Sequence, residues 1–380
     1  MNKLFIFLLF GFIVQAGAQN ASALQLADSL YALGNYNQAI LHYKTAGNSA
    51  TVYNKLAKAY EAAGNTSEAL TYYKKSLGLN HKATITAYHY AKLLTEAGRL
   101  EAADSLFNTL IEANPNNANF VYELGQVKEK RNDSTAINSY NFAYALDSSH
   151  LNTLYKLARH HTVKRNFSSA LKFIDQGLAI DSKSNRFITL RALVAFYYKN
   201  YHEAVKNFEL LLAANQSNEQ LHENLAISYA QTNQFEKAIE QYTILINDYN
   251  DKIPSYHFNL AKAYQAIRYF DKAIRHTEIA IVLQDVTLER EYLQLANIYK
   301  KQGNSKLVFE MMGKAVAENP ESEILQYQRA IAADNYFKDR QSIIDFYEGY
   351  LNKFGDNASY SDLAKQRISD LKKEIHFEKD

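Results

Sequence analysis

A small residue recurs along the chain at nearly constant spacing, and this periodicity restricts the possible folds more than any other feature. The residue usually follows Leu. Successive copies lie 30, 34, 34, 33, 34, 34, 35, 35 and 34 residues apart, at Ala27, Ala57, Ala91, Gly125, Ala158, Ala192, Ala226, Ala261, Ala296 and Ala330. Such a period is typical of solenoids, in which each unit buries its apolar face against the next unit.

The pattern inside each repeat predicts two helices. Tyr53, Leu56, Ala57 and Tyr60 have the i, i+3, i+4, i+7 spacing of one helical face. A second small residue lies twelve positions after the first in most repeats, at Ala39, Ala69, Ala103, Ala170, Ala204, Ala238 and Ala273, while Ala136 is one residue early and the last two repeats carry Val308 and Ser342. Between the two helices, a left-handed Gly is expected to end the first one, at Gly34, Gly64, Gly98 and Gly303. We therefore predict an all-α fold.

The residues in these positions resemble a known repeat family. The second repeat reads Tyr53-x2-Leu56-Ala57-x2-Tyr60 and then Ala69-x3-Tyr73. This order of aromatic, Leu, small and aromatic residues is similar to the tetratricopeptide repeat. The resemblance covers residues 20 to about 355, and it implies a right-handed superhelical solenoid of about ten helix-turn-helix repeats. Pentatricopeptide repeats, which bind RNA, have nearly the same period, but the repeated Ala pairs favour the tetratricopeptide reading.

The N-terminal segment has the features of an export signal. Lys3 precedes an apolar run from Leu4 to Val14, and Ala16-Gly17-Ala18 provides a signal-peptidase site. The run is shorter than the roughly 20 residues that span a bilayer. We predict a signal peptide at 1–18, a mature chain that begins at Gln19, and a soluble periplasmic or secreted protein. The absence of Cys argues against a lipoprotein.

The C-terminal segment is predicted to close the solenoid. Ser361 is a candidate N-cap for a last helix, along which Ala364, Ile368, Leu371 and Ile375 form one apolar stripe. A terminal helix with one polar face is what a solenoid needs, because its last repeat has no neighbour. We therefore expect a signal peptide at 1–18, a solenoid at 19–358, and a capping helix with a tail at 359–380.

Composition and motifs argue against several classes of function. The 42 basic and 40 acidic residues give a net charge of +2, so no global field attracts nucleic acid. The sequence has no Gly-rich phosphate loop, HExxH helix or Gly-x-Ser-x-Gly elbow. His160 and His161 are adjacent, and adjacent side chains on a helix point about 100° apart, which is unsuitable for one metal ion. We expect no catalytic site, no cofactor and no metal.

The resemblance also suggests a binding surface. In tetratricopeptide arrays, positions 2, 5, 9, 12 and 13 of each first helix line a concave groove. Position 5 and position 9 of successive repeats give a predicted binding row of Lys58, Tyr88, Lys92, Tyr122, Gln126, Tyr155 and Arg159. Tyr supplies contact area and Lys or Arg attracts acidic groups. In the alternative interpretation, these tyrosines cover the wall of the solenoid.

Three functional classes follow from this sequence. The favoured one is a scaffold or adaptor of the cell envelope that binds a partner protein or an extended peptide in its groove. The second is a glycan-binding, polysaccharide-export or envelope-assembly subunit, because tyrosine rows also stack on sugars. The third, an enzyme, has no motif to support it.

Overall fold

The computed structural model describes residues 22–284 and 287–377, and the regular elements in these two ranges are helices, with no strand. The predicted signal peptide at 1–18 and the predicted mature terminus at Gln19 lie outside the described residues. Contacts within the chain divide it into two compact units, 1–190 and 191–380. The boundary falls inside helix α11 (Asn185–Tyr197).

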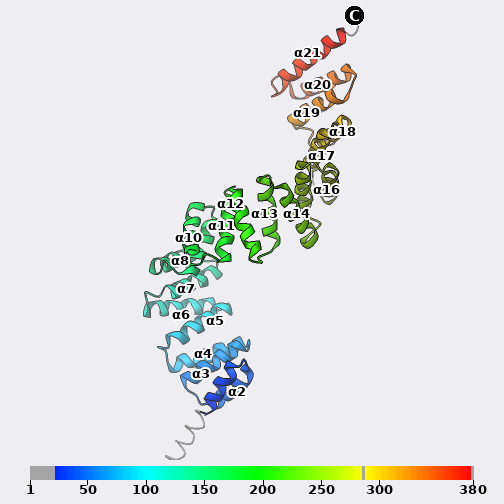
Figure 1. Ribbon diagram of the computed structural model, residues 1–380. Coiled ribbons are helices and arrows are strands. Elements are labelled where there is room, and N and C mark those ends of the chain that lie inside the picture. The colour runs from blue at the N-terminus through cyan, green and yellow to red at the C-terminus, as the bar shows by residue number, and fades with distance from the viewer. Residues whose placement is uncertain (1–21, 285–286, 378–380) are drawn as a thin grey trace, which may run out of the picture. The chain divides into compact units, whose positions relative to one another are not determined.

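The first unit is a stack of helix pairs, seen in Figure 1 from blue to green. Neighbouring helices along the chain pack against each other, as the periodicity predicts. The elements are residues 22–32, α2 (Tyr36–Thr45), α3 (Ala50–Ala62), α4 (Thr66–Leu79), α5 (Thr84–Glu96), α6 (Leu100–Ala113), α7 (Ala118–Lys130), α8 (Ala136–Leu146), α9 (Leu151–Val163) and α10 (Phe167–Ile180).

The second unit is built in the same way and ends in one unpaired helix. A short π-helix, η1 (Leu245–Tyr249), extends α14. The other elements are α12 (Tyr201–Ala213), α13 (Glu219–Gln231), α14 (Phe235–Ile244), α15 (Pro254–Ala266), α16 (Phe270–Leu283), α17 (Glu289–Lys301), α18 (Ser305–Glu318), α19 (Glu323–Tyr336), α20 (Arg340–Phe354) and α21 (Ser361–Phe377).

The recurring small residues form the helix crossings, so the predicted register is confirmed. The alanines of both sets and Gly125 are buried, most with no exposed surface, while Val308 and Ser342 of the last two repeats are half-buried. Gly125 shows why the position must be small, because a Cβ atom there would lie 2.6 Å from the Tyr140 ring. Ala192 and Ala330 are also fully buried although each follows an Arg rather than a Leu. The crossing therefore depends on the small residue more than on the Leu before it.

The turns between paired helices use the left-handed backbone conformation, as predicted. Gly34, Gly64, Gly98 and Gly303 have φ of +80°, +78°, +73° and +76°. In five more of these turns the same conformation is held by residues with side chains, which is costlier for the backbone. These are Asn132, Arg165, Lys199, Asn233 and Arg268, with φ between +56° and +64°. The turn between α19 and α20 has no residue with a positive φ.

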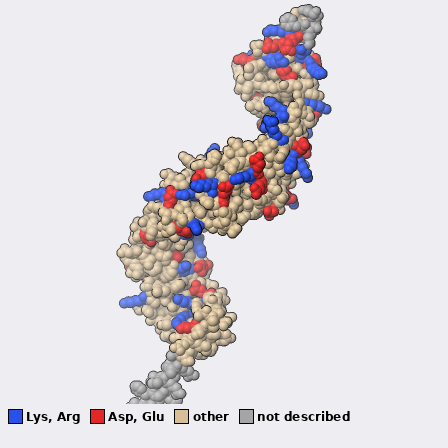
Figure 2. All heavy atoms as spheres, viewed as in Figure 1, with Lys and Arg blue, Asp and Glu red and all other residues tan. Residues whose placement is uncertain are grey.

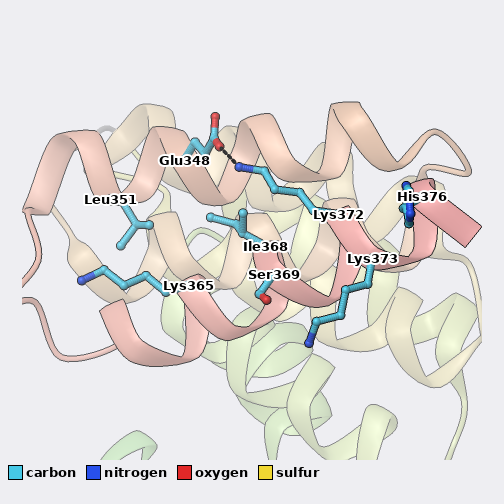
Figure 3. Close-up of a pocket in the computed structure, with 8 residues that line it drawn as sticks. All are labelled: Glu348, Leu351, Lys365, Ile368, Ser369, Lys372, Lys373 and His376. Carbon is cyan, nitrogen blue, oxygen red and sulfur yellow. Dashed lines mark hydrogen bonds and ion pairs between the residues drawn. The ribbon is translucent and has the colours of Figure 1, made fainter.

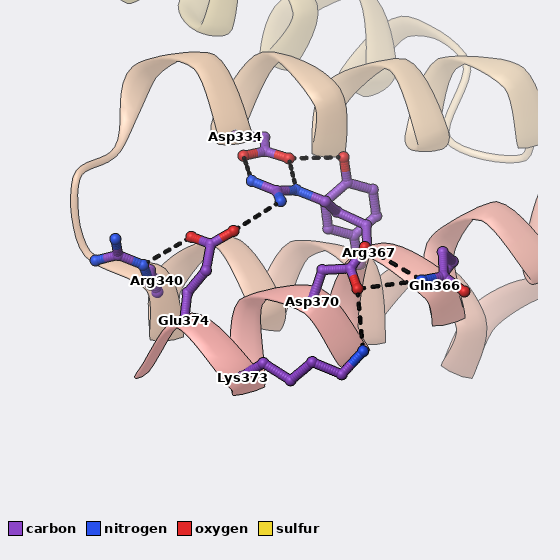
Figure 4. A network of polar contacts seen from close by, with 8 residues as sticks. Asp334, Arg340, Gln366, Arg367, Asp370, Lys373 and Glu374 are labelled. Atoms are coloured by element: carbon purple, nitrogen blue, oxygen red, sulfur yellow. Dashed lines mark hydrogen bonds and ion pairs between the residues drawn. The ribbon is translucent and has the colours of Figure 1, made fainter. Parts of the chain in front are cut away.

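The last helix is fastened by apolar and ionic contacts. Ala364, Ile368 and Leu371 are buried in one core cluster with side chains of α20. Arg367 pairs with Asp334 of α19 at 2.6 Å, as Figure 4 shows. The prediction that Ser361 caps the helix by accepting a hydrogen bond is wrong. Its hydroxyl donates to the carbonyl oxygens of Gly355 and Ala358, at 3.2 and 2.6 Å.

Candidate binding surface

Tyr122, at the centre of the predicted binding row, is a core residue. Its side chain is only 7% exposed, and its ring lies 5.8 Å from the ring of Tyr140 and 5.1 Å from that of His150. Burial raises the pKa of the Tyr122 hydroxyl to about 12. The expectation of an exposed side chain is therefore wrong for Tyr122, because the residue that begins the next repeat covers it.

Glu123 connects the middle of the row, and the sequence interpretation did not identify it. The Tyr88 hydroxyl donates to Glu123 Oε1 at 3.1 Å, and Gln126 Nε2 donates to Glu123 Oε2 at 2.6 Å. Lys92 Nζ lies 4.0 Å from Glu123 Oε1 and over the Tyr88 ring. The Glu123 residue is 8% exposed. One buried carboxylate thus holds three members of the row at fixed positions.

Glu129 has the same role at the end of the row. Arg159 Nη1 lies 3.3 Å from Glu129 Oε1, while Lys156 Nζ and the Tyr140 hydroxyl each lie 2.6 Å from Glu129 Oε2. Burial alone would raise the pKa of Glu129, but these hydrogen bonds and charges outweigh it and lower the pKa. The carboxylate therefore stays ionised and holds Arg159 on the surface.

The remaining members of the row differ in exposure. The half-buried Tyr155 ring has the guanidinium of Arg186 5.3 Å from its centre and the Phe187 ring at 6.0 Å. Lys58 is half-buried and forms no ion pair with a described residue. The side chains of Lys92 and Arg159 are 42% and 53% exposed. The surface is thus formed by cations over tyrosines whose faces are largely covered.

A second candidate lies in the other unit, in the hollow between α17, α18 and α19. Its volume is about 470 Å³, within the usual range of ligand pockets. Leu293, Val308, Met312 and Ile331 supply large apolar side chains. The polar lining residues are Asn297, Lys300, Ser305, Gln328 and Asn335. The sequence interpretation did not identify this α17–α19 hollow.

A third, shallower hollow of about 700 Å³ lies between α20 and α21 (Figure 3). Leu351 and Ile368 lie at its base, and lysines surround them. Each of these lysines already has a carboxylate partner: Lys372 with Glu348 at 3.2 Å, Lys365 with Asp356 at 2.9 Å and Lys373 with Asp370 at 3.5 Å. The lysines of this hollow are therefore already paired with carboxylates of the chain, and the pair Lys372–Glu348 joins α21 to α20.

Two buried histidines form hydrogen bonds with the turns that precede α13 and α15. His222 contacts Gln241 Oε1 at 2.7 Å through Nδ1 and Ser217 Oγ at 2.8 Å through Nε2. His257 occupies the corresponding place and contacts His276 Nδ1 at 3.0 Å and the carbonyl oxygen of Asp251 at 2.9 Å. The repetition of the same contacts in two repeats indicates a structural role for both histidines.

In 22–284 and 287–377, no group of three His, Cys, Asp or Glu side chains is arranged to hold a metal ion. His161 instead stacks on Phe173 with ring centres 5.6 Å apart. Among the helices of these two ranges, none is long and apolar enough to cross a membrane.

Comparison with known proteins gives matches to repeat-family profiles over part of the chain. One tetratricopeptide repeat profile matches residues 24–88 and 189–252, and a second matches residues 60–122. These segments are tetratricopeptide repeats, and the other helix pairs continue the same register of small residues. Such repeats generally mediate interactions between proteins. A search of curated proteins gives no match.

Among the solved structures that match this chain are three with TM-scores below 0.5. YrrB, described as having an unusual peptide-binding site, matches at 18% identity and a TM-score of 0.46, over 51% of this chain and 98% of that one. A tetratricopeptide repeat protein from Parabacteroides merdae matches at 17% identity and 0.41, over 66% and 98%. Yeast Tom70 matches at 14% identity and 0.36, over 95% and 96%.

Proposed function

We propose that this chain is a protein-interaction scaffold of the cell envelope, which binds a partner protein or an extended peptide on the surface of its first helices. The observation that carries the proposal is the set of cations Lys58, Lys92 and Arg159 on α3, α5 and α9, two of which are held by carboxylates of α7. The N-terminal sequence, with its short apolar run and Ala-x-Ala end, supports the location in the envelope.

The geometry favours a partner with acidic side chains. The side chains of Lys92 and Arg159 are 42% and 53% exposed, so an incoming carboxylate can approach each cation while Glu123 and Glu129 stay in place. The cations are already positioned, which reduces the side-chain entropy lost on binding. Figure 2 shows one face of the molecule, on which Lys and Arg are interspersed with Asp and Glu and form no large field of one sign.

A peptide suits this surface better than a sugar does. Stacking on a carbohydrate ring needs an open aromatic face, and the tyrosines of the row are covered. Phe120 lies 5.6 Å from the Tyr88 ring, and Arg186 lies over the Tyr155 ring. The glycan alternative therefore gains no support from these residues.

The test compares wild type with the double reversal Lys92→Glu and Arg159→Glu. The exported, tagged protein is used to capture partners from envelope extract at low and at high salt. We expect the double reversal to lose a specific set of partners that wild type retains, with the difference shrinking at high salt because steering is screened. Far-ultraviolet circular dichroism checks that helicity is kept.

The matched control is Lys164→Glu with Lys183→Glu, which changes the net charge equally at two exposed positions outside the row. The control should capture the same proteins as wild type. If the row reversal and the control behave alike, the binding row is wrong. If wild type captures nothing specific, the proposed function is wrong as well.

A further inference from the structure

The second unit has two hollows at corresponding positions between neighbouring repeats, one small and one large. The smaller hollow, about 180 Å³, lies between α13, α14 and α15 and is lined by Tyr242, Asn259 and Lys262, among others. The α17–α19 hollow, about 470 Å³, is lined by residues from the corresponding helices. The two spaces can be compared residue by residue, because they share one register.

Met312 is the main difference between the two spaces. Tyr242 of α14 is 2% exposed and lines the smaller hollow together with Asn259. In α18 the corresponding residue is Met312, which has no hydroxyl and no ring. Gln328 takes the place of Asn259; it is exposed, and its amide forms no hydrogen bond with another described residue. The space that has Met in place of Tyr is the larger of the two, and an exposed amide lines it.

The rim of the α17–α19 hollow has unused polar groups. Asn297 and Lys300 are exposed and form no hydrogen bond or ion pair with a described residue. Asn335 donates to the carbonyl of Ile331 in its own helix, which leaves its Oδ1 available. A primary amide can donate and accept at once and so matches the N–H and C=O of a peptide backbone. No acidic side chain lines the hollow, so Lys300 has no competing carboxylate there.

We propose that the α17–α19 hollow is a specificity pocket for an extended peptide that carries one bulky apolar side chain next to an acidic residue. The apolar side chain enters between Met312 and Ile331, where the flexible Met adapts to its shape. Gln328 and Asn297 bind the peptide backbone, and Lys300 pairs with the acidic side chain. This assignment rests on the proposed function and adds the sequence class of the partner.

The experiment uses the exported full chain and an array of immobilised peptides of the form Gly-Ser-Z-X-Z-Ser-Gly. X is Leu, Phe, Met, Ala or Ser, and Z is Asp, Ser or Lys. Because Z stands before and after X, a peptide bound in either chain direction places Z on the side of Lys300. We expect wild type to bind peptides with bulky X and acidic Z at least tenfold better than those with X = Ala. Met312→Tyr, which restores the residue found in the smaller hollow, should abolish this preference.

If Met312→Tyr does not fold, a second variant still tests the pocket. Lys300→Glu should shift the preference at Z from Asp to Lys while bulky X is still selected. Lys206→Glu, an equal charge change on the exposed surface of α12, should behave as wild type. The pocket is overturned if X has no effect, if Met312→Tyr binds as wild type does, or if Lys300→Glu still prefers Asp. If the pocket proposal is wrong but the proposed function is right, the binding row still captures its partners. Failure of the pocket can therefore be distinguished from failure of the proposed function.

Discussion

At the scale of single residues, Tyr122 has a structural role that can be measured. Its ring packs between Tyr140 and His150, and it is 7% exposed. Removing a buried aromatic ring leaves a cavity, so we expect Tyr122→Ala to lower the free energy of unfolding by about 3 kcal/mol. Urea denaturation followed by circular dichroism measures the change. Tyr155→Ala, at a half-buried ring, should cost clearly less. Equal costs would contradict the assignment of Tyr122 to the core.

His276 makes stability depend on pH. The carbonyl oxygen of Asp251 can only accept, so His257 Nε2 carries a proton and its Nδ1 accepts from His276 Nδ1–H at 3.0 Å. Burial, the largest cause, and the nearby positive charges of Arg275 and Lys272 lower the pKa of His276 to about 4. The folded state thus binds fewer protons than the unfolded state, and stability falls as the pH drops from about 6.5 towards 4.

The pH effect is testable with one conservative variant. Between pH 7.5 and pH 5 we expect a loss of about 1 kcal/mol, after allowance for solvent screening at a half-buried group. His276→Asn keeps an N–H donor toward His257 but does not titrate, and it should remove most of this pH dependence. Urea melts at both pH values compare the two proteins. An unchanged pH dependence in the variant would assign the effect to other groups.

At the scale of the helices, the crossings tolerate no added volume. Ala238 of α14 has no exposed surface, so Ala238→Leu should destabilise the fold by about 1–3 kcal/mol through overpacking. Because repeats contact only their neighbours, the loss of hydrogen-exchange protection should be strongest in α13 to α15. Glu240→Leu, at an exposed position of the same helix, should change stability by less than about 0.5 kcal/mol. Uniform loss of protection would argue against local packing.

The helix pairs could be predicted from the sequence because their determinants are local. A small residue every 34 positions and a left-handed turn between helices fix each pair, and even Ala136, one residue early, begins its helix as α8. The surface could not be predicted equally well. Whether Tyr122 is exposed depends on His150, which lies in the next repeat. The carboxylate Glu123 is likewise identified only by its contacts.

The α17–α19 hollow shows a second limit of sequence interpretation. The signal was present, since Met312 stands where Tyr73, Tyr140 and Tyr242 occupy other repeats. Met and Tyr both satisfy an apolar pattern, so a pattern of apolar positions does not distinguish a filled space from an open one. The difference appears only when the volume and the unpaired amide of Gln328 are seen together.

At the scale of the whole molecule, export remains a prediction that one measurement decides. The apolar run from Leu4 to Val14 and the site at Ala16-Gly17-Ala18 predict that the mature chain begins at Gln19. Intact mass spectrometry of protein recovered without detergent from the envelope fraction should show the loss of residues 1–18. Retention of these residues in the exported protein would contradict the prediction.

The packing of each helix against its sequence neighbours has a mechanical consequence. A globular domain resists tension through contacts between distant parts of its chain, and it gives way all at once. Within each unit described here, tension would instead open one helix pair after another, and every pair of about 34 residues would release up to roughly 120 Å of chain. The protein could thus lengthen in small reversible steps, and a partner bound to one stretch of helix pairs would remain held while another stretch yields.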